Sequence, residues 1–506
     1  MNGQASERAV WSAMDIRDRI AWLGRFRTLL AADRARLSAL MHEELSIGER
    51  DALWVEVAPL LAACRWLEGN ARGILRDRML DGSPFWLRAG AVREQRAPLG
   101  KIAIIASWMH PVSGLGIPMV QALVCGNTVV VKPSERSPKT QARLMDLAVE
   151  AGLPAGTLAW TGCAREAGAN MLATQRFDHV VFTGSPEVGQ RIAANLSKSG
   201  TPGTFALGGR DSAFVLADAD AKRAARAVWA AVCAENGQTC TAPRRVLVLE
   251  NVHDAFCREL GRLAALAKPV DLIDQAAVAR CKEVMAKALA AGARDASSLG
   301  GSVIPDPTKD EAGVGTDAPT TLFRPAAIVG CAATMDIVEG RHAGPLVCVV
   351  RCANIEEAIG VHKRCDQHAY ASVFTRDEEA GVLLAARLGL SNVLVNDAVA
   401  SAGHPMLARS GKSVSGAGVL RGEEGLLAMT RAVQVCNGRH ASAKLLLKDG
   451  WRTRAACAVI GWWYGAGKAD RIRQGARPKA GVAKRAGPQG GPLPLAAPER
   501  ESKQAA

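Results

Sequence analysis

The chain has 506 residues, of which 48% are hydrophobic and 22% charged, which is long enough for two or three domains with sizeable cores. Its formal net charge of +14 does not indicate nucleic-acid binding, because no nucleic-acid motif accompanies the charge and much of the excess lies in the C-terminal tail. Thirteen cysteines without a C-x-x-C pair indicate neither a metal site nor a disulfide framework, so we expect a cytoplasmic protein.

Apolar residues at helical spacing between Arg8 and about Arg78 predict a pair of long amphipathic helices. Further along, short apolar strands alternate with helical stretches. The expected strands are KIAIIAS, NTVVVKP, DHVVFTG, AFVLAD and RRVLVLE, with LVCVVR, YASVFTR and SNVLVND after residue 345. This alternation predicts an α/β fold with a parallel sheet, whose strand ends bind ligands. From Arg477 onward the composition predicts a disordered tail.

Three turns stand where strands of this sheet should end. Lys132, Ser134 and Glu135 follow the buried run NTVVV, and the segment from Gly184 to Gly189 joins a strand to a helix. A glycine at such a turn lets the backbone approach a ligand, and a helix N-terminus favours an anion such as pyrophosphate. A third turn, ALGGRDS, precedes the segment GQTC that ends at Cys240.

In this order, these motifs resemble those of the aldehyde dehydrogenase superfamily over about Ser6 to Val435. The resemblance rests on KPSE (132–135), FTGS (182–185), LGG (207–209), GQTC (237–240) and VLVND (393–397). It implies a Rossmann-like cofactor domain, an α/β catalytic domain and a small β-arm that assembles homodimers or homotetramers. The implied boundaries are 1–80 and 99–206 for the NAD(P)-binding domain, 207–422 for the catalytic domain, 81–98 and 423–437 for the arm, 438–475 for an apolar and basic extension, and 476–506 for the tail.

The same resemblance implies the chemistry and the residues of the site. In the family a cysteine attacks an aldehyde, hydride passes to NAD(P), and a glutamate activates the water that hydrolyses the thioester. Cys240 is the implied nucleophile. The implied cofactor-binding residues are Trp108, Lys132, Ser134, Glu135, Gly184, Ser185 and Gly189, and Glu135 favours NAD over NADP because a carboxylate repels a 2′-phosphate.

Three polar side chains of the family pattern are replaced in this sequence. The oxyanion asparagine position is Met109, the general-base position is Ala206, and the glutamate that holds the nicotinamide ribose falls on Arg341. Loss of an oxyanion donor costs roughly 100- to 1000-fold in rate, and loss of a general base roughly 100- to 10,000-fold. We therefore expect slow turnover.

Two nearby side chains are candidates for the missing roles. His110 is expected to be a hydrogen-bonded histidine in the pocket wall, whose ring N–H could replace the lost amide donor. Glu235 could act as a substitute base, but an exposed carboxylate at a helix end is the expectation. Two alternatives to aldehyde oxidation stay open: a CoA-acylating dehydrogenase, which needs no base, and a pseudoenzyme that keeps the fold.

The extension after the family region joins the apolar stretch 455–467 to basic residues on both sides. The stretch is too short to span a bilayer, which needs about 20 apolar residues. Its Trp462-Trp463-Tyr464 cluster suits a membrane interface, and nearby basic residues could meet anionic lipid: Lys444, Lys448, Arg452, Arg454, Lys468, Arg471 and Arg473. The alternative is a helix that packs on the body or on a neighbouring subunit.

Overall fold

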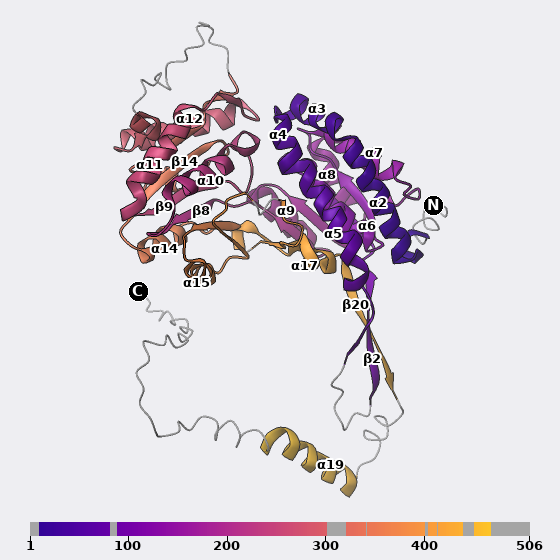
Figure 1. The fold of residues 1–506 in the computed structure, drawn as a ribbon. Helices are drawn as coiled ribbons and strands as arrows, with labels where there is room; N and C mark the ends of the chain where they lie inside the picture. Colours follow the sequence, from indigo (N-terminus) through magenta and orange to yellow (C-terminus); the bar gives the residue numbers. More distant parts are fainter. Residues whose placement is uncertain are drawn as a thin grey trace, which may run out of the picture. The chain divides into compact units, whose positions relative to one another are not determined.

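The computed structural model describes residues 10–80, 89–300, 320–340, 342–399, 403–411, 413–438 and 450–466. The chain divides into two compact units, one made of residues 1–78 and 93–435 and the other of residues 79–92 and 436–506. The predicted tail and Arg341 lie outside the described residues. The first unit contains two large sheets and the elements that carry Cys240 (Figure 1).

The first large sheet has six strands in the order β18-β7-β6-β3-β4-β5. Its strands are β3 (Lys101–Ile105), β4 (Thr128–Lys132), β5 (Leu158–Trp160), β6 (His179–Thr183), β7 (Gly203–Ala206) and β18 (Gly416–Ala417). All neighbouring pairs are parallel except β18 and β7. The predicted strands KIAIIAS, NTVVVKP and DHVVFTG are confirmed.

Both faces of this sheet are covered, as its continuous apolar strands require. Along β3, Ile102 and Ile104 point into a core shared with five helices: α2 (Ile16–Ala32), α3 (Arg34–Leu45), α5 (Ala58–Ile74), α6 (Ser113–Val124) and α7 (Pro138–Glu150). The alternate residues Ala103 and Ile105 join a second core with α8 (Arg165–Thr174) and α9 (Pro186–Ser197). The strand period of two therefore assigns successive residues to opposite layers.

The N-terminal region differs from the predicted pair of helices. It forms α2 (Ile16–Ala32), α3 (Arg34–Leu45) and a continuous helical stretch made of α4 (Glu49–Asp51), the π-helical turn η1 (Ala52–Val57) and α5 (Ala58–Ile74). Asp33 leaves helical geometry after α2, and Ser46 ends α3 in the left-handed region at φ 54°. The apolar period continues across these two breaks, which is why the prediction of two helices was wrong.

The second large sheet has seven strands in the order β11-β13-β14-β9-β8-β15-β16. They are β8 (Asp211–Val215), β9 (Pro243–Leu249), β11 (Arg294–Asp295), β13 (Ala326–Val329), β14 (Leu346–Cys352), β15 (Tyr370–Phe374) and β16 (Asn392–Val395). Only the β11–β13 pair is antiparallel. Helices α10 (Ala221–Cys233) and α11 (Glu250–Ala265) cover one face, and α12 (Gln275–Ala290), α14 (Ile355–Lys363) and α15 (Glu378–Leu388) cover the other.

Smaller elements complete the described chain. Strands β1 (Arg78–Leu80), β2 (Ala89–Pro98) and β20 (Thr430–Gly438) form a three-stranded sheet. The segments predicted as an arm, 81–98 and 423–437, contain β2 and nearly all of β20, whereas β1 precedes the first of them. Short elements near the site are β17 (Arg409–Ser410), β19 (Val419–Leu420) and α17 (Gly422–Ala428). The extension contains α19 (Trp451–Gly461) and the π-helical turn η5 (Trp462–Ala466). No helix in the described ranges has the length and apolar character to cross a bilayer.

A buried asparagine ties three parts of the first unit together, and its removal should lower stability. The Asn127 side chain accepts from the Gly100 backbone N–H at 2.9 Å and donates to the backbone oxygens of Ala122 at 3.0 Å and Met429 at 2.9 Å. Leaving such buried groups unpaired costs about 1–3 kcal/mol each, so Asn127→Ala should lower the urea midpoint. The control Asn251→Ala removes one exposed bond to Ala217 and should leave the midpoint nearly unchanged. Equal midpoints in the two variants would contradict the assignment.

Candidate active site

The predicted cofactor residues gather at one edge of the six-stranded sheet. Neighbouring strands β4, β3, β6 and β7 are parallel, so their carboxyl ends lie side by side. Ile105 pairs with both Lys132 and Phe182, and Thr183 pairs with Ala206. Trp108 follows β3 at this edge, partly buried against the core of the helical layer. This edge is where ligands bind in parallel α/β folds.

Lys132 and Glu135 form one side of this edge. The buried Lys132 donates from Nζ to Glu135 Oε2 at 3.1 Å, and Arg165 Nε lies 3.2 Å from Glu135 Oε1. Ser134 is buried, and its backbone N–H donates to Gln141 Oε1 at 2.7 Å. These hydrogen bonds therefore stabilise the turn, while 37% of the Glu135 side-chain surface stays exposed.

The turn from β6 into α9 is shaped by its glycines. A Cβ at Gly184 would lie 2.4 Å from the Phe182 ring, and a Cβ at Gly189 would lie 2.4 Å from Leu207. Ser185 caps α9 by accepting from the Val188 N–H at 3.4 Å. The helix N-terminus and the close backbone approach fit the pyrophosphate of a dinucleotide, and Glu135 fits its ribose hydroxyls.

Cys240 lies at the end of a strained loop between α10 and β9. Glu235 and Asn236 occupy the left-handed region at φ 49° and 57°, and Gly237 follows at φ 71°. A Cβ at Gly237 would lie 2.2 Å from the Pro345 nitrogen, so only glycine fits there. Arg244 fixes the loop by donating to the backbone oxygens of Gly237 at 3.1 Å and Thr239 at 3.0 Å.

The thiol of Cys240 faces a guanidinium from a distant part of the chain. Arg409 Nη2 lies 3.1 Å from Cys240 Sγ, and the guanidinium carbon lies 5.8 Å from the centre of the Tyr370 ring. Burial alone would raise the pKa of Cys240, but the charge of Arg409 and a hydrogen bond from His110 more than offset it and lower the pKa to about 5. Cys240 is therefore a thiolate at neutral pH.

Three buried cysteines elsewhere in the chain respond to burial in the ordinary way. Burial raises the pKa of Cys125 and of Cys352 to about 12 in each case, and it raises that of Cys281 to about 11. Within the described part of the chain, no guanidinium donates a hydrogen bond to any of these three sulfurs. The guanidinium contact and the lowered pKa thus distinguish Cys240 from these three thiols.

His110 lies between the nucleophile loop and a buried carboxylate. Its Nδ1 is 2.8 Å from Glu56 Oε1, and its Nε2 is 3.0 Å from Thr239 Oγ1. Glu56, from the π-helical turn η1, accepts from the backbone N–H groups of Val112 at 2.8 Å and Ser113 at 2.9 Å, at the start of α6. Burial opposes the charged form of Glu56, but His110 and these donors lower its pKa. The prediction of a hydrogen-bonded pocket histidine is confirmed.

Glu235 is not the exposed carboxylate that its position suggested. Its side chain is only 4% exposed, Oε2 lies 3.3 Å from His110 Nδ1, and Oε1 has no hydrogen-bond partner. The backbone at Glu235 is left-handed and turns the side chain inward. The prediction of an exposed carboxylate assumed an ordinary helix end and was therefore wrong. Burial raises the pKa of Glu235, with the nearby Glu56 adding to the effect.

Glu56, His110 and Glu235 each offer one ligand atom within 4.8 Å of the others, the spacing of a metal site. The separation of 2.8 Å between His110 Nδ1 and Glu56 Oε1 is a hydrogen-bond distance. We therefore assign the cluster to proton sharing.

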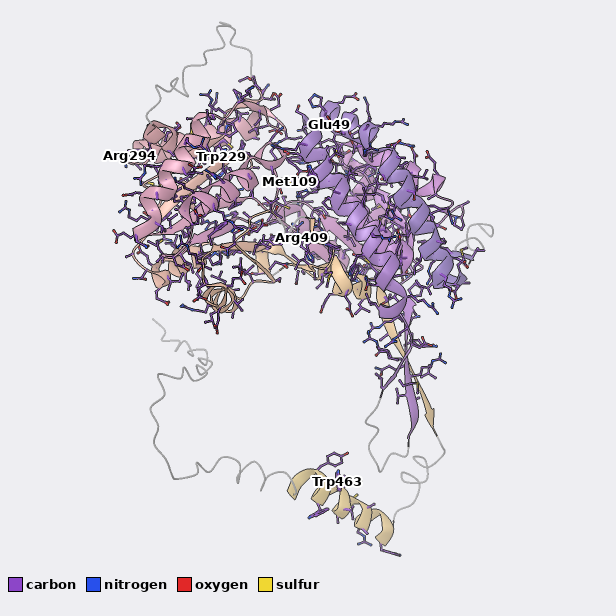
Figure 2. All side chains as sticks on the ribbon, in the orientation of Figure 1. Glu49, Met109, Trp229, Arg294, Arg409 and Trp463 are labelled. Carbon is purple, nitrogen blue, oxygen red and sulfur yellow. The ribbon has the colours of Figure 1, made fainter. Side chains whose placement is uncertain are left out.

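Two of the replaced family positions lie at this site. Met109 lines a pocket together with His110, Thr183, Arg409 and Arg421, and Figure 2 labels Met109 and Arg409. Ala206 ends β7, two residues before Gly208, where an added Cβ would lie 3.7 Å from the Cys240 Cβ. The two side chains carry no polar atom, so other groups must supply the donor and the base.

Sequence reasoning missed Arg409, Glu56 and Thr239. Glu56 stands alone in the apolar run LWVEVAP, and a single acid on a buried helix face is a signal that could have been read. Arg409 offered no comparable signal, because it follows a short irregular segment and reaches Cys240 across 169 residues.

Comparisons with known proteins agree with this architecture. The sequence model of the aldehyde dehydrogenase family matches residues 3–435. The chain is 28% identical over 433 residues to a 4,4'-diapolycopene aldehyde oxidase from Methylomonas sp, covering 83% of this chain and 77% of that protein. It is 26% identical to an NADP-dependent glyceraldehyde-3-phosphate dehydrogenase from Streptococcus equinus, covering 85% and 88%.

Solved structures show the same fold. The structure of an NADP-dependent glyceraldehyde-3-phosphate dehydrogenase from Bacillus halodurans, complexed with NADP, superimposes with a TM-score of 0.74 at 25% identity. The alignment covers 85% of this chain and 88% of that one.

The acidity of Cys240 can be measured by alkylation. The rate of reaction of Cys240 with iodoacetamide, followed by peptide mass mapping, should be constant near neutral pH and fall as the pH drops through about 5, because the thiol replaces the thiolate. Arg409→Met should move the midpoint up by about one pH unit or more. The surface variant Arg262→Met should leave it in place. A wild-type midpoint near that of a free cysteine would contradict the thiolate.

Proposed function

Because the chain belongs to the aldehyde dehydrogenase family, whose activity is NAD(P)-dependent oxidation of aldehydes, we propose that Cys240 is its nucleophile. The observation that carries this proposal is the contact of 3.1 Å between Cys240 Sγ and the Arg409 guanidinium, which maintains a thiolate. The thiolate would add to the aldehyde carbon, and water would hydrolyse the resulting thioester to a carboxylate. NAD(P), when bound at the edge near Lys132 and Gly184, would supply the hydride acceptor.

Arg409 can take over the role of the missing oxyanion donor at Met109. When sulfur bonds to the aldehyde carbon, the negative charge moves from Sγ to the carbonyl oxygen, two bonds away. The guanidinium that pairs with the sulfur has several N–H groups, so it can follow the charge to the oxygen. One cation then serves both the thiolate and the oxyanion.

We propose NAD as the preferred cofactor, bound by Trp108, Lys132, Ser134, Glu135, Gly184, Ser185 and Gly189. The support is the partly exposed Glu135 carboxylate at the strand edge, whose charge opposes a 2′-phosphate. Two of the similar proteins are NADP-dependent. In this chain Lys132 and Arg165 are both engaged by Glu135, which leaves less positive charge for a phosphate.

The remaining assignments follow the family architecture. We propose that residues 1–80 and 99–206 bind the cofactor, that 207–422 carry the catalytic cysteine, and that 81–98 and 423–437 assemble a cytoplasmic homodimer or homotetramer. Segment 438–475 is proposed to touch a membrane surface peripherally. Its support is the exposure of Trp462 (63%), Trp463 (57%, labelled in Figure 2) and Tyr464 (58%).

The nucleophile can be tested by rapid mixing with NAD and a panel of aldehydes. The wild type should release about one NADH per subunit in a burst, followed by a slower phase, because no carboxylate stands at position 206. Cys240→Ala should abolish both phases, whereas Cys125→Ala should keep them. Addition of CoA tests thiol acceptance: a large acceleration of the slow phase would mean acyl transfer to CoA. Turnover that persists in Cys240→Ala would contradict the proposal.

Cofactor choice can be tested by calorimetry. Glu135→Gln should raise the affinity for NADP by about tenfold or more, because it removes one negative charge and releases Lys132 and Arg165. Lys132→Ala should weaken NAD binding, while Lys139→Ala, an exposed lysine on α7, should not. NADP binding that is tighter than NAD binding in the wild type would reverse the assignment.

A further inference from the structure

Beyond the effect of His110 on the Cys240 thiolate, the cluster of Glu56, His110 and Glu235 has no role in the addition step. His110 Nδ1 contacts both carboxylates, at 2.8 Å and 3.3 Å, while the other ring nitrogen faces Thr239 and the Cys240 loop. All three side chains are at most 5% exposed. Ionisable groups buried together at a reactive centre cost desolvation free energy, so they call for a function of their own.

Hydrolysis of the thioester needs a base, and the family position for it is Ala206. Alanine cannot take a proton, so the base must come from another element near Cys240. His110 meets the requirement of position, because its Nε2 lies 3.0 Å from Oγ1 of Thr239, the residue before Cys240. It also lines the same pocket as Arg409, whose Nη2 lies 3.1 Å from Cys240 Sγ.

We propose that His110 is the general base that activates water for hydrolysis of the Cys240 thioester, with Glu56 and Glu235 as its positioning residues. This inference rests on the proposed function of Cys240. It assigns the base to the strand end after β3, across the site from the turn where the family places it.

The protons and electrons of the step balance. In the thioester state His110 first loses its proton to solvent. Its imidazole then removes one proton from water while the water oxygen bonds to the thioester carbon. The tetrahedral intermediate breaks its C–S bond, the electron pair returns to Sγ, and the carboxylic acid product releases the second proton. The starting pair, thiolate and imidazolium, is restored.

The charge of Cys240 controls the protonation of His110, and His110 can act as a base only when it is neutral. Burial opposes the charged imidazole, but Glu235 and the hydrogen bond with Cys240 raise the pKa of His110 well above its ordinary value. Acylation removes the thiolate charge, so one of the groups that hold the proton on His110 disappears. The imidazole is therefore protonated beside the thiolate and more readily neutral beside the thioester.

The charged groups around His110 either favour or oppose its protonated form. Glu56 from η1 and Glu235 from η2 (Ala234–Gly237) favour the imidazolium, as does the Cys240 thiolate. Arg409 and Arg421 line the same pocket and oppose it. Glu56 also anchors the ring orientation, since its second oxygen is held by the first backbone N–H groups of α6.

The step can be isolated without cofactor by acylating Cys240 with p-nitrophenyl acetate at pH 8. The burst of p-nitrophenolate measures acylation, and the slow phase, with loss of the acetyl mass from the protein, measures hydrolysis. Absence of a burst in the wild type would refute the nucleophile itself. A normal burst with unaltered hydrolysis in the variants would refute only the base, so the two failures are distinguishable.

We expect His110→Gln to slow hydrolysis of the acetyl-enzyme by roughly 100-fold or more while the burst stays within about tenfold of the wild type. Two matched controls should hydrolyse at the wild-type rate. His179→Gln alters a buried histidine bonded to Thr204, and Glu259→Gln alters a carboxylate paired with Arg226 and Arg262. Hydrolysis by His110→Gln within threefold of the wild type overturns the proposal.

The pH dependence of hydrolysis can distinguish a positioning role of Glu235 from a purely structural role. Hydrolysis should rise with pH as His110 loses its proton, with a midpoint above the ordinary pKa of histidine. Glu235→Gln should shift this midpoint to lower pH, because removal of the carboxylate charge lowers the pKa of His110. A midpoint that is unchanged in Glu235→Gln overturns this role.

A carboxylate restored at the family position gives the rescue experiment. In the His110→Gln background, Ala206→Glu should speed hydrolysis at least about tenfold, because a base is again next to the thioester. A double variant that hydrolyses at the rate of His110→Gln alone, with a normal burst, would mean that His110 supports hydrolysis by something other than proton transfer, and would overturn the proposal.

Discussion

The contact of 3.1 Å between the Arg409 guanidinium and the Cys240 sulfur is the interaction on which the rest of the site depends. Both groups are only partly exposed to water, and their opposite charges favour the ionised form of each. Two separate pieces of chain must therefore be held to within a fraction of an ångström. The loop before Cys240 is fixed by Gly237 and by the donors of Arg244, and Arg409 is fixed by its strand pairing with Leu420.

Much of the fold and of the cofactor edge could be read from the sequence, because both follow from local rules. Buried strands of a parallel sheet are short continuous apolar runs, and residues that follow them lie at one edge. This places Lys132, Glu135 and Gly184 correctly at strand ends without knowledge of the three-dimensional structure. The segment around Cys240 was likewise marked by its neighbours Gly237 and Gln238.

The electrostatic partners of Cys240 could not be read in this way, because they depend on long-range contacts. Arg409 is 169 residues away, and Glu56 reaches His110 from a π-helical turn 54 residues earlier. Glu235 is close in sequence, yet its buried position depends on a left-handed backbone that no sequence period reveals. Backbone patterns predict where a site lies, whereas the ionisation of its groups requires the packed structure.

A thiolate stabilised by Arg409 would conflict with a carboxylate base at position 206, because both negative charges would lie close together beside Cys240. A carboxylate beside Cys240 raises the pKa of the thiol and competes with it for Arg409. His110 avoids this conflict, since its protonated form is a second cation beside the thiolate, and its own counter-charges Glu56 and Glu235 lie on the far side of the ring. On this view the alanine at position 206 and the guanidinium of Arg409 fit one electrostatic arrangement, in which the carboxylates lie one imidazole away from the sulfur.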